Sequence, residues 1–133
     1  MGRELVYLDS SVALRTILEV PERTHVQSWM DRAGTLVSSR LLRTEVGRVL
    51  RREGRPLVEA TPLLDRVGLV EIGRDTHAVA ESVERPVKTL DALHLATALL
   101  LGEPVVVATH DRTMKEVATH LGLEVVDPVE HAV

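Results

Sequence analysis

The feature of this sequence that most constrains its fold is a regular alternation of short apolar runs with segments of helical periodicity. Five apolar runs have the length of β-strands, and they are expected at residues 5–8, 35–38, 69–72, 105–108 and 124–126. Strands that alternate with helices are typical of a parallel sheet covered by right-handed crossover helices. We therefore predict an α/β fold of three layers (α/β/α) with a central parallel sheet of about five strands.

The segments between these runs are expected to be helical. Their amphipathic spacing and their capping residues predict helices at residues 12–18, 22–33, 40–53, 57–66, 76–83, 91–101 and 112–121. Gly54, Gly102 and Gly122 are expected to end three of them. The chain shows no internal repeat and no linker, so residues 1–133 are expected to form one domain.

The composition excludes several classes of site. Cysteine is absent, which excludes disulfides, thiolate nucleophiles and cysteine-based zinc sites. One Tyr, one Trp and no Phe leave base stacking on aromatic side chains almost unavailable. The sequence shows neither a signal peptide nor the roughly 20 apolar residues that a membrane span needs. We therefore expect a cytoplasmic protein that does not enter a membrane.

Two aspartates are expected at the ends of neighbouring strands. Asp9 directly follows the strand at 5–8, and Asp111 lies just past the strand at 105–108. In an open parallel sheet, sites form beyond the carboxyl ends of the strands, where the strand order reverses. The two carboxylates are therefore well placed to meet.

Two further acids are expected on buried sides of helices. Glu45 lies within the apolar arc of its helix, which is formed by Leu41, Leu42, Val46, Val49 and Leu50. Asp91 begins a helix whose other residues are almost all apolar. A buried carboxylate is costly unless it is paired or binds a cation.

Each of these acids also has a purely structural interpretation. Asp9, Asp91 and Asp111 precede helices and could be ordinary N-caps, and Glu45 could be partly exposed or pair with an arginine. Together, however, they would place several carboxylates side by side, where they repel one another unless a divalent cation binds. A donor set of oxygen atoms alone favours Mg²⁺, with Mn²⁺ as a substitute. Such a site suits hydrolysis of a phosphodiester bond.

The net charge of −4 does not exclude a nucleic-acid substrate, because arginines gather on one helix. Arg40, Arg43 and Arg51 are candidate RNA contacts there, although a solvated helix face is the alternative. His94 comes three residues after Asp91. We expect it on a helix surface or at an interface rather than as a partner of the acids.

Four segments in this order resemble the PIN-domain nucleases, and among them the VapC-type toxins of bacterial toxin–antitoxin pairs. The apolar strand ending in Asp9-Ser10-Ser11 resembles the first family motif, and Thr44-Glu45 resembles the helix-borne glutamate. Residues 89–96, with the sequence Thr-Leu-Asp-Ala-Leu-His-Leu-Ala, resemble the most distinctive segment, and residues 109–111 resemble the final Thr-x-Asp. The resemblance covers essentially the whole chain.

The resemblance implies a PIN-like fold and an Mg²⁺-dependent endoribonuclease that forms a homodimer and is inhibited by a small cognate antitoxin. Asp9, Asp91 and Asp111 would bind metal, and Glu45 would help to hold metal or water. Ser11 and Thr109 would support the site. Some family members carry a further acid shortly after the final aspartate, where this chain has Arg-Thr-Met at residues 112–114. One metal ion and two therefore both stay open, as does the identity of the RNA.

Two other functions compete with a nuclease. A phosphatase or phosphotransfer domain on a similar fold is disfavoured, because haloacid-dehalogenase-like phosphatases need an aspartate where this chain has Ser11. A receiver domain needs adjacent acids and a late lysine, and neither is evident. A non-catalytic PIN-like binding module is disfavoured by the full acidic set.

Overall fold

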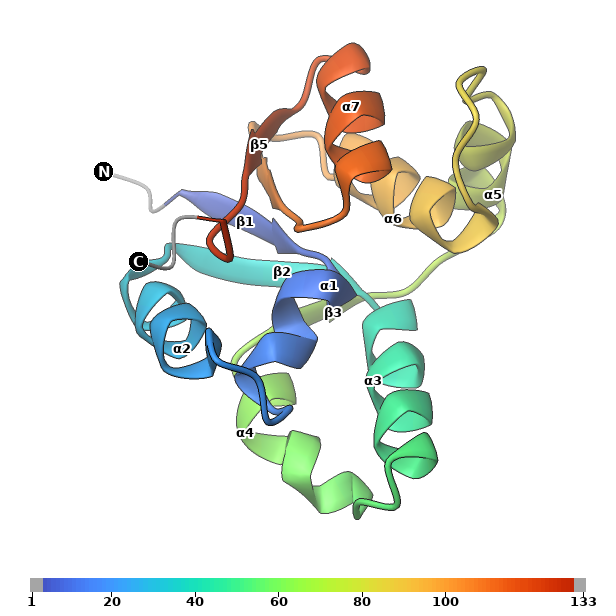
Figure 1. The fold of residues 1–133 in the computed structure, drawn as a ribbon. Coiled ribbons are helices and arrows are strands. Elements are labelled where there is room, and N and C mark those ends of the chain that lie inside the picture. The colour runs from blue at the N-terminus through green and yellow to red at the C-terminus, as the bar shows by residue number, and fades with distance from the viewer. Residues whose placement is uncertain (1–3, 131–133) are drawn as a thin grey trace.

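The computed structural model describes residues 4–130, so the first and last three residues of the predicted domain lie outside the described part. Five strands form one parallel sheet in the order β3-β2-β1-β4-β5 (Figure 1). The strands are β1 (Leu5–Leu8), β2 (Thr35–Ser39), β3 (Gly68–Val70), β4 (Val106–Ala108) and β5 (Glu124–Val126). The predicted fold class and number of strands are confirmed.

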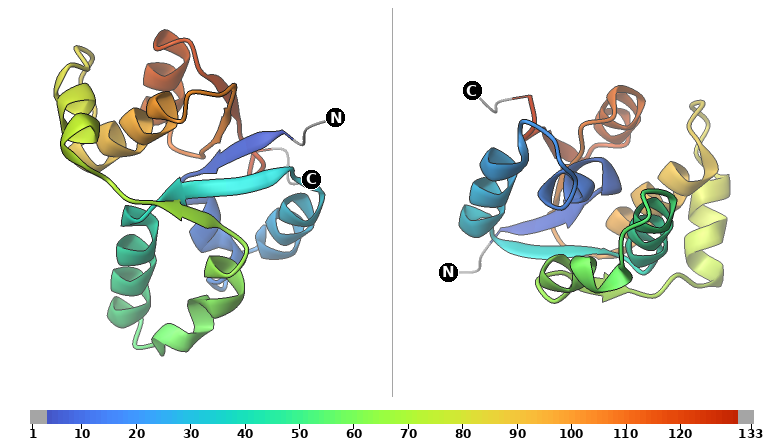
Figure 2. Two further views of the ribbon diagram at one scale, coloured as in Figure 1. Left: turned by 180° about the vertical axis from the view of Figure 1, so that it is seen from behind. Right: turned by 60° about the horizontal axis from the view of Figure 1, so that its bottom comes forward.

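Helices cover the two faces of the sheet (Figures 1 and 2). One group consists of α1 (Ser10–Ala13), the 3₁₀ helix η1 (Leu14–Thr16), α2 (Arg23–Arg32), α3 (Leu41–Arg52), the 3₁₀ helix η2 (Leu57–Ala60) and α4 (Thr61–Leu64). The other consists of α5 (Arg74–Glu81), α6 (Thr89–Leu100) and α7 (Arg112–His120).

The alternation of side chains along β1 separates two apolar cores. Val6 and Leu8 belong to the core beneath the first group of helices, whereas Tyr7 packs with Leu95 and Met114 of the second group. This is the two-residue period expected of a strand buried on both faces.

The strand order reverses between β1 and β4. The chain passes from β1 to β2 on one side and from β4 to β5 on the other. Leu8 pairs with Ala108 in the register of these two strands, and the backbone N–H of Asp9 donates to the carbonyl of Ala108 at 3.0 Å. Asp9 and Thr109 therefore leave the sheet side by side, at the place where open parallel sheets form their sites.

Several boundaries differ from the sequence-based prediction. The first helix begins at Ser10 rather than residue 12, because the Asp9 side chain caps it. The segment predicted as a helix at 57–66 is two short helices instead, and Pro62 lies in the first turn of the second, where a missing N–H costs little. Strand β3 ends at Val70, two residues earlier than predicted.

The predicted helix ends at glycines are confirmed. Gly54 and Gly102 follow α3 and α6 with φ of 68° and 72°, the left-handed conformation that glycine adopts without strain. Within residues 4–130, no helix has the length and apolar character needed to cross a membrane.

Candidate active site

Asp9 is the most buried of the four predicted acids, with 2% of its surface exposed. It is the N-cap of α1, and only its Oδ2 atom makes hydrogen bonds. Oδ2 accepts from the hydroxyls of Ser11 and Thr109 at 2.6 and 2.8 Å. Oδ1 is buried and has no hydrogen-bond partner among the described residues. Capping of α1 therefore explains the contacts of one carboxylate oxygen of Asp9 and leaves the burial of the other unexplained.

The hydroxyls of Ser11 and Thr109 join β1 to the segment after β4. They lie 3.3 Å apart, and both donate to Asp9. The Ser11 oxygen also accepts from the backbone N–H of His110 at 2.9 Å, and the Thr109 oxygen accepts from that of Asp111 at 3.1 Å. These four bonds fix the Asp9 carboxylate relative to the start of α7.

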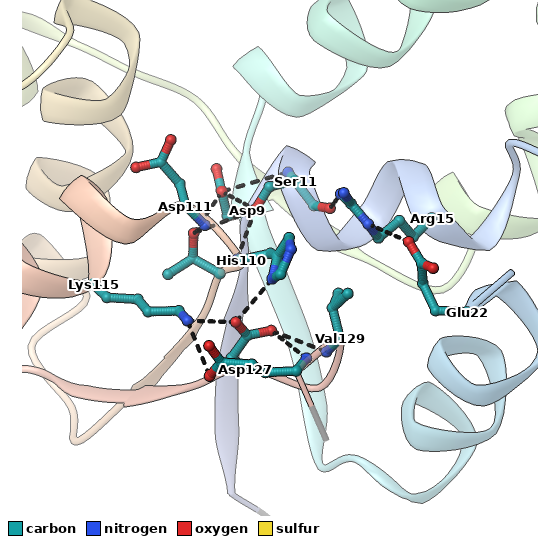
Figure 3. A network of polar contacts seen from close by, with 11 residues as sticks. Asp9, Ser11, Arg15, Glu22, His110, Asp111, Lys115, Asp127 and Val129 are labelled. Atoms are coloured by element: carbon teal, nitrogen blue, oxygen red, sulfur yellow. Dashed lines mark hydrogen bonds and ion pairs between the residues drawn. The ribbon is translucent and has the colours of Figure 1, made fainter. Parts of the chain in front are cut away.

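Asp111 is the N-cap of α7, and its Oδ1 accepts from the backbone N–H of Met114 at 2.8 Å. Among residues 4–130, no hydrogen bond or ion pair engages Oδ2. Figure 3 shows the carboxylates of Asp111 and Asp9 on the same side of the network, whereas the ring of His110 points the other way. As at Asp9, capping uses one carboxylate oxygen and leaves the other.

Asp91 lies in the first turn of α6, and Lys88 rather than Asp91 is the N-cap of that helix. The pKa of Asp91 is raised to about 6, chiefly by burial and in addition by the negative charges of Asp9 and Asp111. The opposing effect of His94 is smaller. The structure therefore places Asp91 within electrostatic range of the other two aspartates.

Glu45 faces inward from α3, with 18% of its side chain exposed. Its Oε1 atom lies 2.6 Å from Nε2 of His94, and its Oε2 accepts from the hydroxyl of Ser10 at 3.3 Å. The negative charge of Glu45 also contributes to the raised pKa of Asp91. We call Asp9, Glu45, Asp91 and Asp111 the acidic site.

The expectation for His94 is wrong. It is fully buried, with 0% of its surface exposed, and it contacts Glu45 rather than a helix surface or an interface. Burial alone lowers the pKa of His94, but the hydrogen bond and charge of Glu45, together with the negative charges of Asp9 and Asp91, outweigh it, so the pKa is raised. The sequence held a signal for this: a helix that is apolar on all sides must bury any histidine at its centre.

Residues 6–119 match the PIN domain family. The chain belongs to this family. The match spans the two strand-end motifs and the helices that carry Glu45 and Asp91. It favours the PIN-type interpretation of the acidic site over the phosphatase and receiver alternatives.

Curated relatives of this PIN domain are named as ribonucleases. Ribonuclease VapC35 of Mycobacterium tuberculosis is 32% identical over 133 aligned positions, which cover 93% of this chain and 97% of the relative. Ribonuclease VapC46 of the same species is 32% identical over 126 positions, covering 92% and 97%. The resemblance to VapC-type proteins is thus confirmed over nearly the whole length of both.

Solved structures share the PIN-like architecture. Mycobacterium tuberculosis VapC20, described as a toxin that cleaves the sarcin–ricin loop, superposes with a TM-score of 0.69 and 14% identity over 84% of this chain and 93% of its own. The structure of FitAB bound to an IR36 DNA fragment superposes with a TM-score of 0.62 and 18% identity over 93% and 95%. At these identities the likeness shows the fold alone.

The acidic site of this PIN domain has the chemistry of a site for a hard divalent cation. All of its donors are carboxylate oxygens, and the buried Oδ1 of Asp9 lacks a partner. Within residues 4–130, however, no three His, Asp or Glu side chains already form a cluster that could enclose a metal ion. Mg²⁺ is typically held by one or two carboxylates and several waters, which suits such an open arrangement.

A second polar cluster lies beside the site and was not anticipated from the sequence. Asp127 follows β5 and accepts from Nδ1 of His110 at 2.9 Å, from Nζ of Lys115 at 2.5 Å, and from the backbone N–H groups of Val129 and Glu130 (Figure 3). Burial alone raises the pKa of Asp127, but these partners outweigh it and lower the pKa to about 2. The cluster holds the end of the chain against the loop that carries Asp111.

The predicted RNA-contacting arginines line a hollow of about 460 Å³ along α3 and η2. Its lining is Arg40, Arg43, Thr44, Gly47, Arg48, Arg51, Arg55, Pro56 and Leu57. Arg55 is tied to Glu59 and to the carbonyl of Ile17. Arg43 and Arg51 form no ion pair with any of the described residues, and both are exposed. Their guanidinium groups are therefore open to an anion.

Proposed function

We propose that this chain is an Mg²⁺-dependent endoribonuclease, the toxin of a VapBC-type pair, that hydrolyses RNA phosphodiester bonds. The observation that carries the proposal is the acidic site, in which Asp9 keeps a buried carboxylate oxygen without a partner. Four acids are gathered with no described lysine or arginine forming an ion pair to any of them. A bound divalent cation would balance these charges.

Each residue of the site has a distinct task in this proposal. Asp9, Asp91 and Asp111 would hold the cation, for which Mn²⁺ could substitute. When bound, the cation would act as a Lewis acid and stabilise the developing charge on phosphate. Glu45, fixed by His94, would orient the attacking water or complete the cation site. Ser11 and Thr109 would keep the Asp9 carboxylate in place through their two hydrogen bonds.

The names of the curated relatives support the reaction type. Ribonucleases VapC35 and VapC46 match this chain at 32% identity over more than nine tenths of its length. The name of the VapC20 structure shows that one protein with this fold cuts a structured RNA loop. A structured RNA therefore belongs in any panel of candidate substrates.

The proposal is tested by incubating the purified protein with structured and unstructured RNAs in Mg²⁺, in Mn²⁺ or in EDTA. We expect cleavage that requires the metal and disappears in Asp9→Asn. Cleavage that persists in EDTA would contradict the metal dependence. If no RNA is cut, calorimetric titration of the acidic site with Mn²⁺ decides whether a cation binds at all, and no binding would overturn the proposal.

The arginines of α3 are proposed to contact the RNA backbone. Exposed arginines neutralise phosphates and release counterions, so their loss weakens binding and its salt dependence together. Arg43→Glu combined with Arg51→Glu should reduce RNA affinity and flatten the dependence of affinity on salt concentration. A control with the same change of charge reverses Arg32 and Arg74, two exposed arginines on α2 and α5. Equal effects of both pairs would remove α3 from the RNA surface.

The partners implied by the family resemblance are part of the same proposal. They are a small cognate antitoxin and a second copy of this chain, acting in the cytoplasm. Leu99 and Leu100 at the end of α6 are partly exposed, at 36% and 43%, and would suit a protein-covered surface. Sedimentation equilibrium of the isolated protein tests the dimer, and a mass equal to one chain at all concentrations would contradict it.

A further inference from the structure

A chain of three polar side chains, two of them fully buried, leads from the middle of the sheet to the acidic site. The hydroxyl of Tyr7 lies 2.6 Å from Nδ1 of His94, and Nε2 of His94 lies 2.6 Å from Oε1 of Glu45. Tyr7 and His94 are both 0% exposed. Their rings meet edge to face, with centroids 5.7 Å apart and an angle of 72°. Both nitrogens of the imidazole are thus used.

The direction of these hydrogen bonds follows from the contacts of Tyr7. Its hydroxyl oxygen accepts from the backbone N–H of Ser39 at 3.0 Å, at the end of β2. Burial raises the pKa of Tyr7, so the hydroxyl keeps its proton. That proton can be donated to Nδ1 of His94. In the neutral ring the remaining proton is then on Nε2, which donates to the Glu45 carboxylate.

We propose that Tyr7 and His94 are positioning residues that fix the Glu45 carboxylate at the acidic site. The inference rests on the proposed nuclease function. Glu45 lies on α3 and His94 on α6, two helices that belong to opposite layers of the fold. The imidazole therefore joins the two layers beyond the end of β2 and sets the position of one acid relative to Asp91, which is three residues before it on α6.

A purely structural role explains these contacts less well. Apart from Thr97, whose hydroxyl donates to the carbonyl of Leu93 within the helix, the other buried residues of α6 are apolar, and a leucine in place of His94 would avoid the cost of burying an imidazole. The ring instead makes two short hydrogen bonds, one to a tyrosine that is itself anchored to the backbone. In metal sites, partners of this kind orient the acids or histidines that hold the ion, and their loss typically costs roughly 10- to 100-fold in affinity.

The first test is nitrogen NMR of the His94 ring in the intact protein, at an alkaline pH where the ring is neutral. We expect a protonated Nε2 that exchanges slowly with water and an unprotonated Nδ1. Tyr7→Phe should speed that exchange, because the ring loses the hydroxyl that holds it. An unprotonated Nε2, or exchange unaltered in Tyr7→Phe, would overturn the proposal.

The second test measures Mn²⁺ affinity by calorimetry. His94→Leu removes the donor to Glu45, and we expect at least about a 10-fold loss of affinity. His94→Gln can present a side-chain N–H near the position of Nε2 and should recover part of that loss. Leu95→Val is the control, because it perturbs the same buried helix with a side chain that makes no hydrogen bond.

The outcomes separate this proposal from the nuclease function. Wild-type protein that neither binds Mn²⁺ nor cuts RNA would overturn the proposed function. If His94→Leu binds Mn²⁺ as tightly as the wild-type protein does, only the positioning role is overturned. Equal losses in His94→Leu and Leu95→Val would also overturn it, since they would show a general loss of stability. If a cleaved RNA is known, His94→Leu should lower kcat while leaving KM unaltered.

Discussion

Two buried aspartates occupy equivalent places in the sheet and have opposite surroundings. Asp9 directly follows β1 and Asp127 directly follows β5, and they are 2% and 5% exposed. Asp127 is neutralised by Lys115 and His110 and by two backbone N–H groups. One oxygen of Asp9 accepts from two hydroxyls, and the other has no donor among the described residues. The cationic side chain of Lys115 thus pairs with Asp127, whereas no described lysine or arginine pairs with Asp9.

The difference appears in the pKa values of the two regions. In the Asp127 cluster the partners outweigh burial and lower the pKa of Asp127 to about 2. At the acidic site, burial and neighbouring carboxylates raise the pKa of Asp91 to about 6. A buried carboxylate with cationic and backbone partners stabilises a fold, whereas neighbouring carboxylates that repel one another are costly. The Asp127 cluster therefore stabilises the fold, and the acidic site is the region that we propose binds a cation.

The largest expected effect is on activity and comes from a substitution of Asp9 in the acidic site. Asp9→Asn removes a charge from the proposed metal site, and cleavage of a susceptible RNA should fall by about 100-fold or more. The free energy of unfolding should change little, because an amide can still accept from Ser11 and Thr109. Cleavage assays and urea unfolding measure the two quantities. A variant that unfolds would favour the cap interpretation of Asp9.

Substitution of Asp127 should lower the stability of the fold rather than the activity. Asp127→Ala deletes four hydrogen-bonding or ionic contacts and leaves Lys115 without its main partner, so the free energy of unfolding should fall by about 2–3 kcal/mol. Glu130→Ala, which removes only the exposed partner of Lys115, should cost less than about 0.5 kcal/mol. Urea unfolding at neutral pH measures both. Similar losses would show that Asp127 is no special anchor.

The ionic part of this anchor should disappear in acid. Because the pKa of Asp127 is lowered to about 2 by folding, its contribution is fully present above its ordinary value near 3.8 and is lost as the pH falls from there to 2. Asp127→Asn should therefore be less stable than wild type by about 1–2 kcal/mol at pH 7, and the gap should close toward pH 2. A gap that is constant with pH would show that hydrogen bonding alone anchors the chain.

The smallest expected effect is a gain in stability, in the variant Asp91→Asn. Folding raises the pKa of Asp91 from 3.8 to about 6, so ionised Asp91 destabilises the metal-free fold increasingly as the pH rises through that range. Asp91→Asn should raise the free energy of unfolding by about 1 kcal/mol at pH 7, after allowance for solvent screening, and by nothing at pH 3.5. Thermal unfolding in EDTA measures the gain. A loss of stability at pH 7 would show that the acids do not repel.

The strands and most helix ends could be predicted from the sequence because they depend on local patterns. The two-residue alternation on β1 and the glycine at residue 54 act within a few positions of the chain. The short helices between residues 57 and 64 were predicted less well. Their ends depend on a turn before Pro62 that periodicity does not show.

The partners of buried polar side chains could not be predicted in this way. Burial statistics placed His94 on a helix surface or at an interface. Its partners Glu45 and Tyr7 lie 49 and 87 positions away along the chain. The Asp127 cluster likewise joins β5 to α7 and the loop before it. Nothing within a few residues of these side chains identifies the group that pairs with them.

The sequence by itself determined which acids are expensive to bury: Asp9 at a strand end, Glu45 on an apolar helix arc and Asp91 on an apolar helix. Only the tertiary structure decided which buried carboxylate forms an ion pair with a lysine side chain. Asp127 meets Lys115, whereas Asp9 meets hydroxyls and lies within electrostatic range of other acids. The physical reason is that the cost of burying a charge follows from the residue and its local element, while its compensation depends on groups that folding brings from elsewhere.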